Sequence, residues 1–282
     1  MRCDMEDTFE LKVRLIEIRA NNYRAPFSIP VFDFTLSMME HIGDPDPFLR
    51  DELIYMTIQQ WVMQGMYTSG QLLQLLHICL DKHHLFCKIG EKGTESVFTR
   101  SFSVLLIPLI LFADRQQPFL SSGDTEMLKN ELVAYLLMEN DLRGYTGDTG
   151  WAHAMAHAAD AFEDLARSEH IQQPALMEIL NTLQAKICNH QYTFINEEDE
   201  RTVAAVVTVW DRSLLTDEEI AGWIKRFGTA PKPGRFPDDH VLGMNVKCFL
   251  RSLYFRVLNH EVHHKYTDII LKTLRQLEQA GE

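Results

Sequence analysis

The side chains whose types and spacing could support chemistry gather between Asp141 and Asp164. His153 and His157 are four residues apart, so one helix would hold both imidazoles on the same face, where they could chelate one metal ion. Asp160 would follow on that face and could add an oxygen ligand. The segment therefore predicts a divalent-metal site formed by His153, His157 and Asp160.

A loop punctuated by three glycines leads into this predicted helix. We expect Asp148 or Thr149 to cap the helix and His153 to lie in its first turns, where the helix dipole favours a neutral imidazole. Free backbone amides at the same end would suit an anion, which Arg143 and Tyr145 could help to orient. The candidate ligand-binding residues are Arg143, Tyr145, Trp151, His153, His157 and Asp160.

The same pattern also fits a helix without an active site. At about 100° per residue, the stripe of histidine and aspartate side chains lies opposite a stripe that includes Trp151, Met155 and Phe162. An amphipathic helix buries its apolar stripe and turns its polar stripe to solvent. We therefore favour exposure or structural hydrogen bonding of the histidines over a binding role.

A second candidate metal site lies near the end of the chain, where His260 to His264 read HEVHH. This matches the H-E-x-x-H pattern of zinc peptidases, in which His260 and His264 would bind zinc and Glu261 would act as the general base. Asp268 could be a third ligand. Charged flanking residues and the few residues that follow argue against this interpretation, and an exposed helix surface is the preferred alternative.

The remaining reactive residues form no complete catalytic set. His83 and His84 stand close to Cys87, but one such group without further partners is weak evidence for a metal site. The chain has no G-x-S-x-G sequence and no phosphate-binding glycine loop. We expect no cofactor, with a divalent metal ion as the open option.

The composition indicates which partners the chain is not expected to bind and in which compartment it is expected to reside. The 282 residues carry a formal net charge of −13, which argues against binding to nucleic acid or to anionic membranes. Five cysteines without a C-x-x-C pair are typical of free thiols in a reducing cytoplasm. The acidic N-terminus is unlike a secretory signal. The apolar run 104–113 is too short to span a bilayer, so we expect it to form a buried core helix.

The elements that must position these residues are helices. Apolar residues recur at helical spacing, and glycine, proline and acidic clusters divide the chain into about eleven helical segments. The β-branched run Thr202–Trp210 is interpreted as a buried helix, and Thr216 with Glu219 predicts a capping box. Short loops favour stacked antiparallel pairs in an α-solenoid of HEAT-like type. We expect one domain over residues 1–282, with a possible boundary at 228–239 before a C-terminal helix pair.

Several stretches resemble a known family. They are RGY at 143–145, GWAHAMAHAAD at 150–160, the apolar run after Phe102 that ends in Ala113-Asp114-Arg115, and the segment from Asn245 to Tyr254. They are similar to an uncharacterised bacterial family, domain of unknown function 2785. The resemblance implies a bacterial, cytoplasmic, all-helical protein and carries no activity.

Two functional hypotheses follow. The favoured one is a binding or scaffold module that takes a protein or a small ligand on its helical surface. The alternative is a metal- or anion-dependent enzyme of the hydrolase class, centred on the loop and helix from Arg143 to Asp160. The sequence determines neither the oligomeric state nor whether the chain is an enzyme.

Overall fold

The structure is a computed structural model that describes the backbone of residues 2–26 and 30–279, with side chains from Thr8 onward. All regular elements in these residues are helical: twelve α-helices and three short segments of 3-10 or π type. The nearest approach to a strand is one bridge between Tyr145 and Trp151. The all-helical prediction is confirmed.

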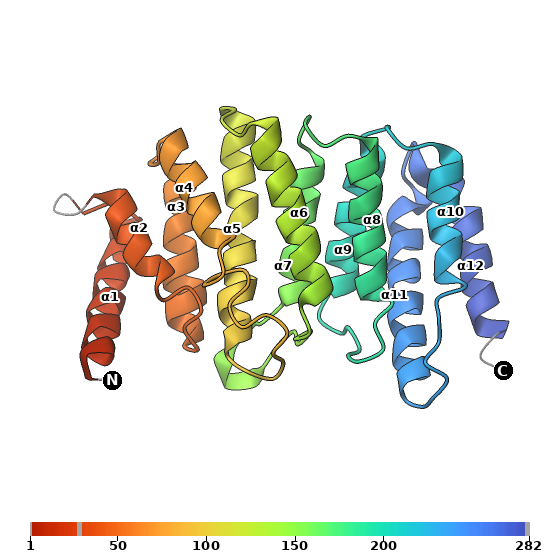
Figure 1. The fold of residues 1–282 in the computed structure, drawn as a ribbon, viewed down its shortest axis with the longest axis horizontal. Coiled ribbons are helices and arrows are strands. Elements are labelled where there is room, and N and C mark those ends of the chain that lie inside the picture. Colours follow the sequence, from red (N-terminus) through yellow and green to blue (C-terminus); the bar gives the residue numbers. More distant parts are fainter. Residues whose placement is uncertain (1, 27–29, 280–282) are drawn as a thin grey trace. The chain divides into compact units, whose positions relative to one another are not determined.

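The chain forms two compact units, and the first comprises Met1–Ser121 and Glu139–His157. Its elements are α1 (Arg2–Ala20), α2 (Val31–Met39), the π-type η1 (Phe48–Tyr55), α3 (Met56–Met63), α4 (Ser69–Cys79), α5 (Ser96–Gln116) and η2 (Gly147–Thr149). Within this unit α5 packs against α3 and α4, and α1 packs against η1 and α3 (Figure 1). Residues 139–157, which carry most of the predicted site, also belong to this unit.

The second unit comprises Ser122–Met138 and Ala158–Glu282. It holds α6 (Ser122–Met138), most of α7 (Ala154–Ala166), α8 (Gln173–Ile187), α9 (Glu198–Asp211), α10 (Asp217–Phe227), α11 (Asp238–Leu258), η3 (His263–Tyr266) and α12 (Thr267–Gln279). Within it α11 packs against α8, α9 and α12 (Figure 1). The segment 228–239 joins α10 to α11 inside this unit, and the single-domain expectation stays a prediction.

The apolar run 104–113 lies in α5, where most of its side chains are buried. By length and composition alone α5 could cross a membrane, and among the described residues it is the one helix that could. However, 67% of its most apolar stretch is buried inside the protein. The prediction of a buried core helix is therefore confirmed.

Two local predictions in the second unit are confirmed as well. The β-branched run lies in α9, where Val203, Val206 and Val209 are buried at helical spacing, so packing outweighs the weak helix propensity of valine. At α10, Oγ1 of Thr216 accepts the backbone N–H of Glu219, and the Glu219 carboxylate accepts the backbone N–H of Thr216. This capping box starts α10 one residue after the threonine.

Candidate functional site

The chain between Tyr145 and His153 is a tight loop and not the start of a helix. Left-handed φ angles of 79° at Gly147, 73° at Gly150 and 50° at His153 keep this segment out of the α-helical conformation. α7 therefore begins only at Ala154. The predictions of a helix cap before Gly150 and of His153 in the first helical turns are wrong.

Because Trp151 precedes α7, it does not lie on the packing face of that helix. Trp151 is 39% exposed, and Tyr145 is 57% exposed. The two rings meet edge to face with centroids 5.0 Å apart, and the imidazole of His153 stacks on the indole at 4.3 Å. We call Tyr145, Trp151 and His153 the aromatic ledge.

Backbone hydrogen bonds close the loop that carries the ledge. The N–H of Thr146 donates to the carbonyl of Gly150 at 2.8 Å, and the N–H of Ala152 donates to the carbonyl of Gly144 at 2.9 Å. The N–H of His153 is bonded in the same way to the carbonyl of Arg143. Each exposed ring is therefore attached to a backbone that is held on both sides.

A buried arginine anchors this loop to the chain before η1. The guanidinium of Arg50 is fully buried and donates to the backbone carbonyls of Asp44 and Thr149, at 2.8 Å each. It also lies over the ring of Phe98, 4.2 Å from the centroid. A Cβ atom added at Gly150 would lie 2.8 Å from Cβ of Pro47, so the approach of the two segments requires glycine.

The guanidinium of Arg143 forms hydrogen bonds within the protein. It forms two hydrogen bonds with the buried carboxylate of Asp141, at 2.8 and 2.7 Å, and donates to the carbonyl of Thr94 at 2.7 Å. Asp141 also accepts the backbone N–H of Gly93 at 2.8 Å. These contacts hold the loop in place, and anion binding by Arg143 stays a prediction.

His157 is buried, contrary to the expected exposure of the polar stripe. Its Nδ1 lies 3.1 Å from the carbonyl oxygen of Ser101 in α5, to which it donates because a carbonyl can only accept. Its ring also contacts the rings of Phe102 and His153. Exposure of His157 was therefore wrong, because α5 contacts this residue, whereas the alternative of a structural hydrogen bond is confirmed for it.

Asp160 lies in the second unit, whereas His153 and His157 lie in the first. Its carboxylate forms a two-point ion pair with Arg201. Burial raises the pKa of Asp160, and the ion pair with Arg201 opposes that rise. The predicted metal site of His153, His157 and Asp160 stays a prediction, and each of the three has other contacts.

The HEVHH segment is not part of an α-helix, so the preferred interpretation as an exposed helix surface is wrong about the helix and right about the exposure of Glu261 and His264. α11 ends at Leu258, and a 3-10 turn follows at His263–Tyr266. Glu261 and His264 are exposed. The structure instead brings His260 together with His263 and with Asp211, which lies about fifty positions earlier in the sequence.

Sequence reasoning missed both of these partners. The H-E-x-x-H pattern assigns no role to the position of His263, although the spacing of His260 and His263 could have drawn attention to it. No local signal connects Asp211 to this segment, because the packing of α9 against α11 brings them together.

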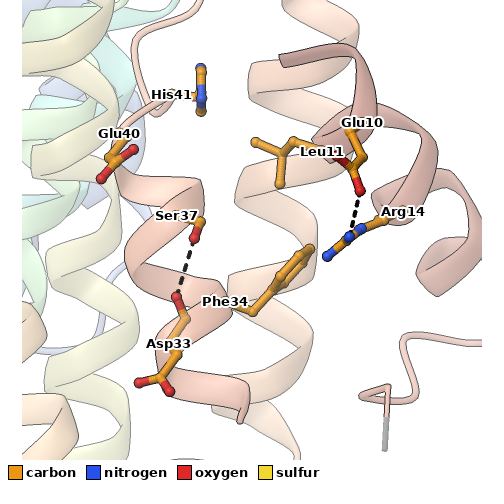
Figure 2. A pocket seen from close by; sticks show the side chains of 8 residues that line it. All are labelled: Glu10, Leu11, Arg14, Asp33, Phe34, Ser37, Glu40 and His41. Carbon is orange, nitrogen blue, oxygen red and sulfur yellow. Dashed lines mark hydrogen bonds and ion pairs between the residues drawn. The ribbon is translucent and has the colours of Figure 1, made fainter. Parts of the chain in front are cut away.

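Two of the hollows in the described part of the first unit are lined by histidine side chains, and the sequence indicated neither of them. One, of about 610 Å³, is lined by Glu40 and His41 and by His83, His84 and Cys87, so the predicted histidine–cysteine group lies on one cavity wall. The other, of about 310 Å³, lies between α1 and α2 (Figure 2). Figure 2 shows that it is lined mainly by polar side chains: Glu10, Arg14, Asp33, Ser37, Glu40 and His41, with Leu11 and Phe34. Its carboxylates suit a cation better than an anion.

Comparison with known proteins identifies one family. The family model described as "Protein of unknown function (DUF2785)" matches residues 85–255. No curated protein and no solved structure matches the chain significantly. The match covers more than half of the chain and includes the aromatic ledge.

Proposed function

The chain belongs to the family of proteins of unknown function DUF2785, and we propose that this member binds a positively charged peptide segment of another protein on its aromatic ledge. In this proposal it is a soluble helical-repeat protein of the bacterial cytoplasm. Its helices would form stacked antiparallel pairs in a HEAT-like α-solenoid that serves as the scaffold for the ledge. It would bind neither nucleic acid nor membranes.

The exposure of the ledge on a fixed backbone is the observation that carries this proposal. Large aromatic side chains in water are a source of binding energy, because a partner can remove their apolar area from solvent at little cost in side-chain entropy. Tyr145 and Trp151 are both more than a third exposed, while the loop hydrogen bonds and Arg50 hold their backbone. Backbone strain at His153, with its φ of 50°, is also typical of functional loops.

The charge of the partner follows from the surroundings of the ledge. Asp148 lies on the loop itself, and Asp44 lies three positions before Pro47, the residue against which Gly150 is placed. The whole chain carries a formal charge of −13. His153 covers one face of the indole, and a lysine or arginine side chain could lie against the exposed part of the ring as a cation–π contact. The acidic charge of the chain would attract the rest of the peptide.

The enzyme alternative gains no support from the same residues. Arg143 is bonded to Asp141, His157 to the carbonyl of Ser101, and Asp160 to Arg201. A hydrolase centred on the loop and α7 would need these groups to act on a substrate. It stays a prediction without a structural observation in its favour.

Peptide binding to variants of the ledge tests the proposal. We expect a fluorescein-labelled peptide of alternating glycine and arginine to bind the wild-type protein and its glutamate counterpart to bind far more weakly. Trp151→Ala should weaken binding about tenfold or more, the effect of a single interface hot spot. Fluorescence anisotropy at constant salt measures both affinities.

The matched control is Phe236→Ala, which replaces an aromatic residue of the second unit that is 86% exposed. It should leave the affinity unchanged. Equal binding of the arginine and glutamate peptides would contradict the proposal, and so would equal losses in the two variants.

A further inference from the structure

Three potential metal ligands converge in the second unit, apart from the aromatic ledge. Asp211 ends α9, His260 lies in the turn after α11, and His263 begins η3. One ligand atom from each residue lies within 4.8 Å of the other two. Among the described residues, this is the one group of three histidine, cysteine or acidic side chains that comes so close.

The two imidazoles face the same carboxylate oxygen. Nε2 of His263 lies 2.7 Å from Oδ1 of Asp211, and Nε2 of His260 lies 3.7 Å from that atom. The two rings are nearly parallel, with centroids 4.3 Å apart. An ion placed between these atoms would meet two nitrogens and one oxygen on one side, which leaves its other positions open.

Burial differs between the ligands in a way that suits an ion entering from solvent. The side chain of His263 is 3% exposed and contacts the rings of Trp210 and Tyr266. Asp211 and His260 are 52% and 30% exposed. The innermost ligand is therefore fixed, while the outer two are accessible.

We propose that Asp211, His260 and His263 bind a divalent transition-metal ion of the zinc class. Two imidazoles and one carboxylate form a ligand set that such ions prefer, with room for water or another ligand. The ion would join the end of α9 to the turn between α11 and α12. Glu261 and His264, which the sequence pattern would use, have no part in this site.

The hydrogen bonds around the imidazoles of His260 and His263 limit the affinity of this site for a metal ion. Ligation through Nε2 leaves the ring proton on Nδ1, where a metal-bound histidine ordinarily donates to a carbonyl or carboxylate. Nδ1 of His260 instead faces the N–H groups of Val262 and His263, at 3.3 and 3.2 Å. Nδ1 of His263 is buried without a hydrogen-bond partner among the described residues. We therefore expect a dissociation constant in the micromolar range, about 10- to 100-fold weaker than that of a fully supported site.

Titration of the full-length, metal-stripped protein with zinc chloride tests this site, with calorimetry as the measurement and the visible absorption of added cobalt as a second one. We expect one equivalent to bind and the melting temperature to rise. His260→Ala and Asp211→Asn should each weaken binding about tenfold or more. Both positions are partly exposed, so circular dichroism should show an intact fold.

His264→Ala is the matched control, because it removes an exposed histidine of the same segment that lies outside the proposed ligand set. It should bind zinc as the wild type does. The proposal is overturned if no saturable binding occurs below about 1 mM, or if binding survives both ligand variants. A loss with His264→Ala as large as with His260→Ala would also overturn it and would favour the sequence pattern.

Discussion

At the scale of single residues, buried charges set the position of the functional loop. Arg100 and Glu139 are fully buried and form two hydrogen bonds, at 2.6 and 2.9 Å. Glu139 also accepts the backbone N–H of Asp141, and Asp141 holds Arg143, whose carbonyl begins the ledge loop. A continuous series of charged contacts therefore runs from α5 to the aromatic ledge.

Replacement of one residue in this series of contacts should lower the stability of the fold. We expect Glu139→Gln to lower the free energy of unfolding by about 3–5 kcal/mol, because it leaves the buried guanidinium of Arg100 without its counter-charge. Urea denaturation measures the change. Glu10→Gln breaks the ion pair of Glu10 with Arg14 on the surface of α1 and should cost less than about 1 kcal/mol. Similar values for the two variants would refute the structural role of the buried pair.

At the scale of elements, the residues at which helices begin determine which side chains of the site are exposed. α10 begins at a capping box, whereas the start of α7 is delayed to Ala154 by residues with left-handed backbone. This delay moves Trp151 from a helix face into an exposed loop. The ledge therefore exists because the helix begins later than its sequence pattern indicates.

Two glycines of the ledge loop allow the contact of that loop with Pro47 to be tested. Gly147 and Gly150 have similar φ angles, but only Gly150 lies against Pro47, and a Cβ atom at Gly147 would meet nothing within 4 Å. Gly147→Ala should cost about 1 kcal/mol for its positive φ. The backbone cost of Gly150→Ala should be about 1–3 kcal/mol, because its ψ of −142° lies in a region almost confined to glycine. Gly150→Ala should cost about 1–3 kcal/mol more from the overlap with Pro47. Thermal unfolding of the two variants measures the difference, and equal losses would exclude a role for the contact.

At the scale of the whole molecule, net charge and burial are the two properties that bear on contact with a membrane. The formal net charge is −13, and α5, the one described helix long and apolar enough to cross a bilayer, supplies core residues to its own unit. The family match begins in the first unit and ends in the second, so it is not confined to one of them.

We expect the expressed chain to stay in the supernatant after high-speed centrifugation without detergent. The reason is that the apolar side chains of α5 are already packed against the protein and are unavailable to lipid. Fractionation followed by immunoblotting checks this. Recovery of the chain with membranes after a carbonate wash would show that α5 leaves the core and enters the bilayer.

The sequence by itself determined the features that depend on near neighbours along the chain. Helical periodicity and the capping box of Thr216 act within about four residues, so the all-helical fold, the buried α5 and the helix over Thr202–Trp210 were predictable. That the 141–164 segment holds a binding site stays a prediction.

Only the tertiary structure decided what surrounds each candidate side chain. Arg50 bonds to the carbonyl of Thr149 across 99 positions, and His157 bonds to Ser101 across 56. Asp211 meets His263 across 52. Contacts between residues so far apart in the sequence arise from packing between elements and leave no periodic signal in the sequence. For that reason only the structure shows that His157 is buried, that Trp151 is exposed, and that His263, not His264, lies close to His260 and Asp211.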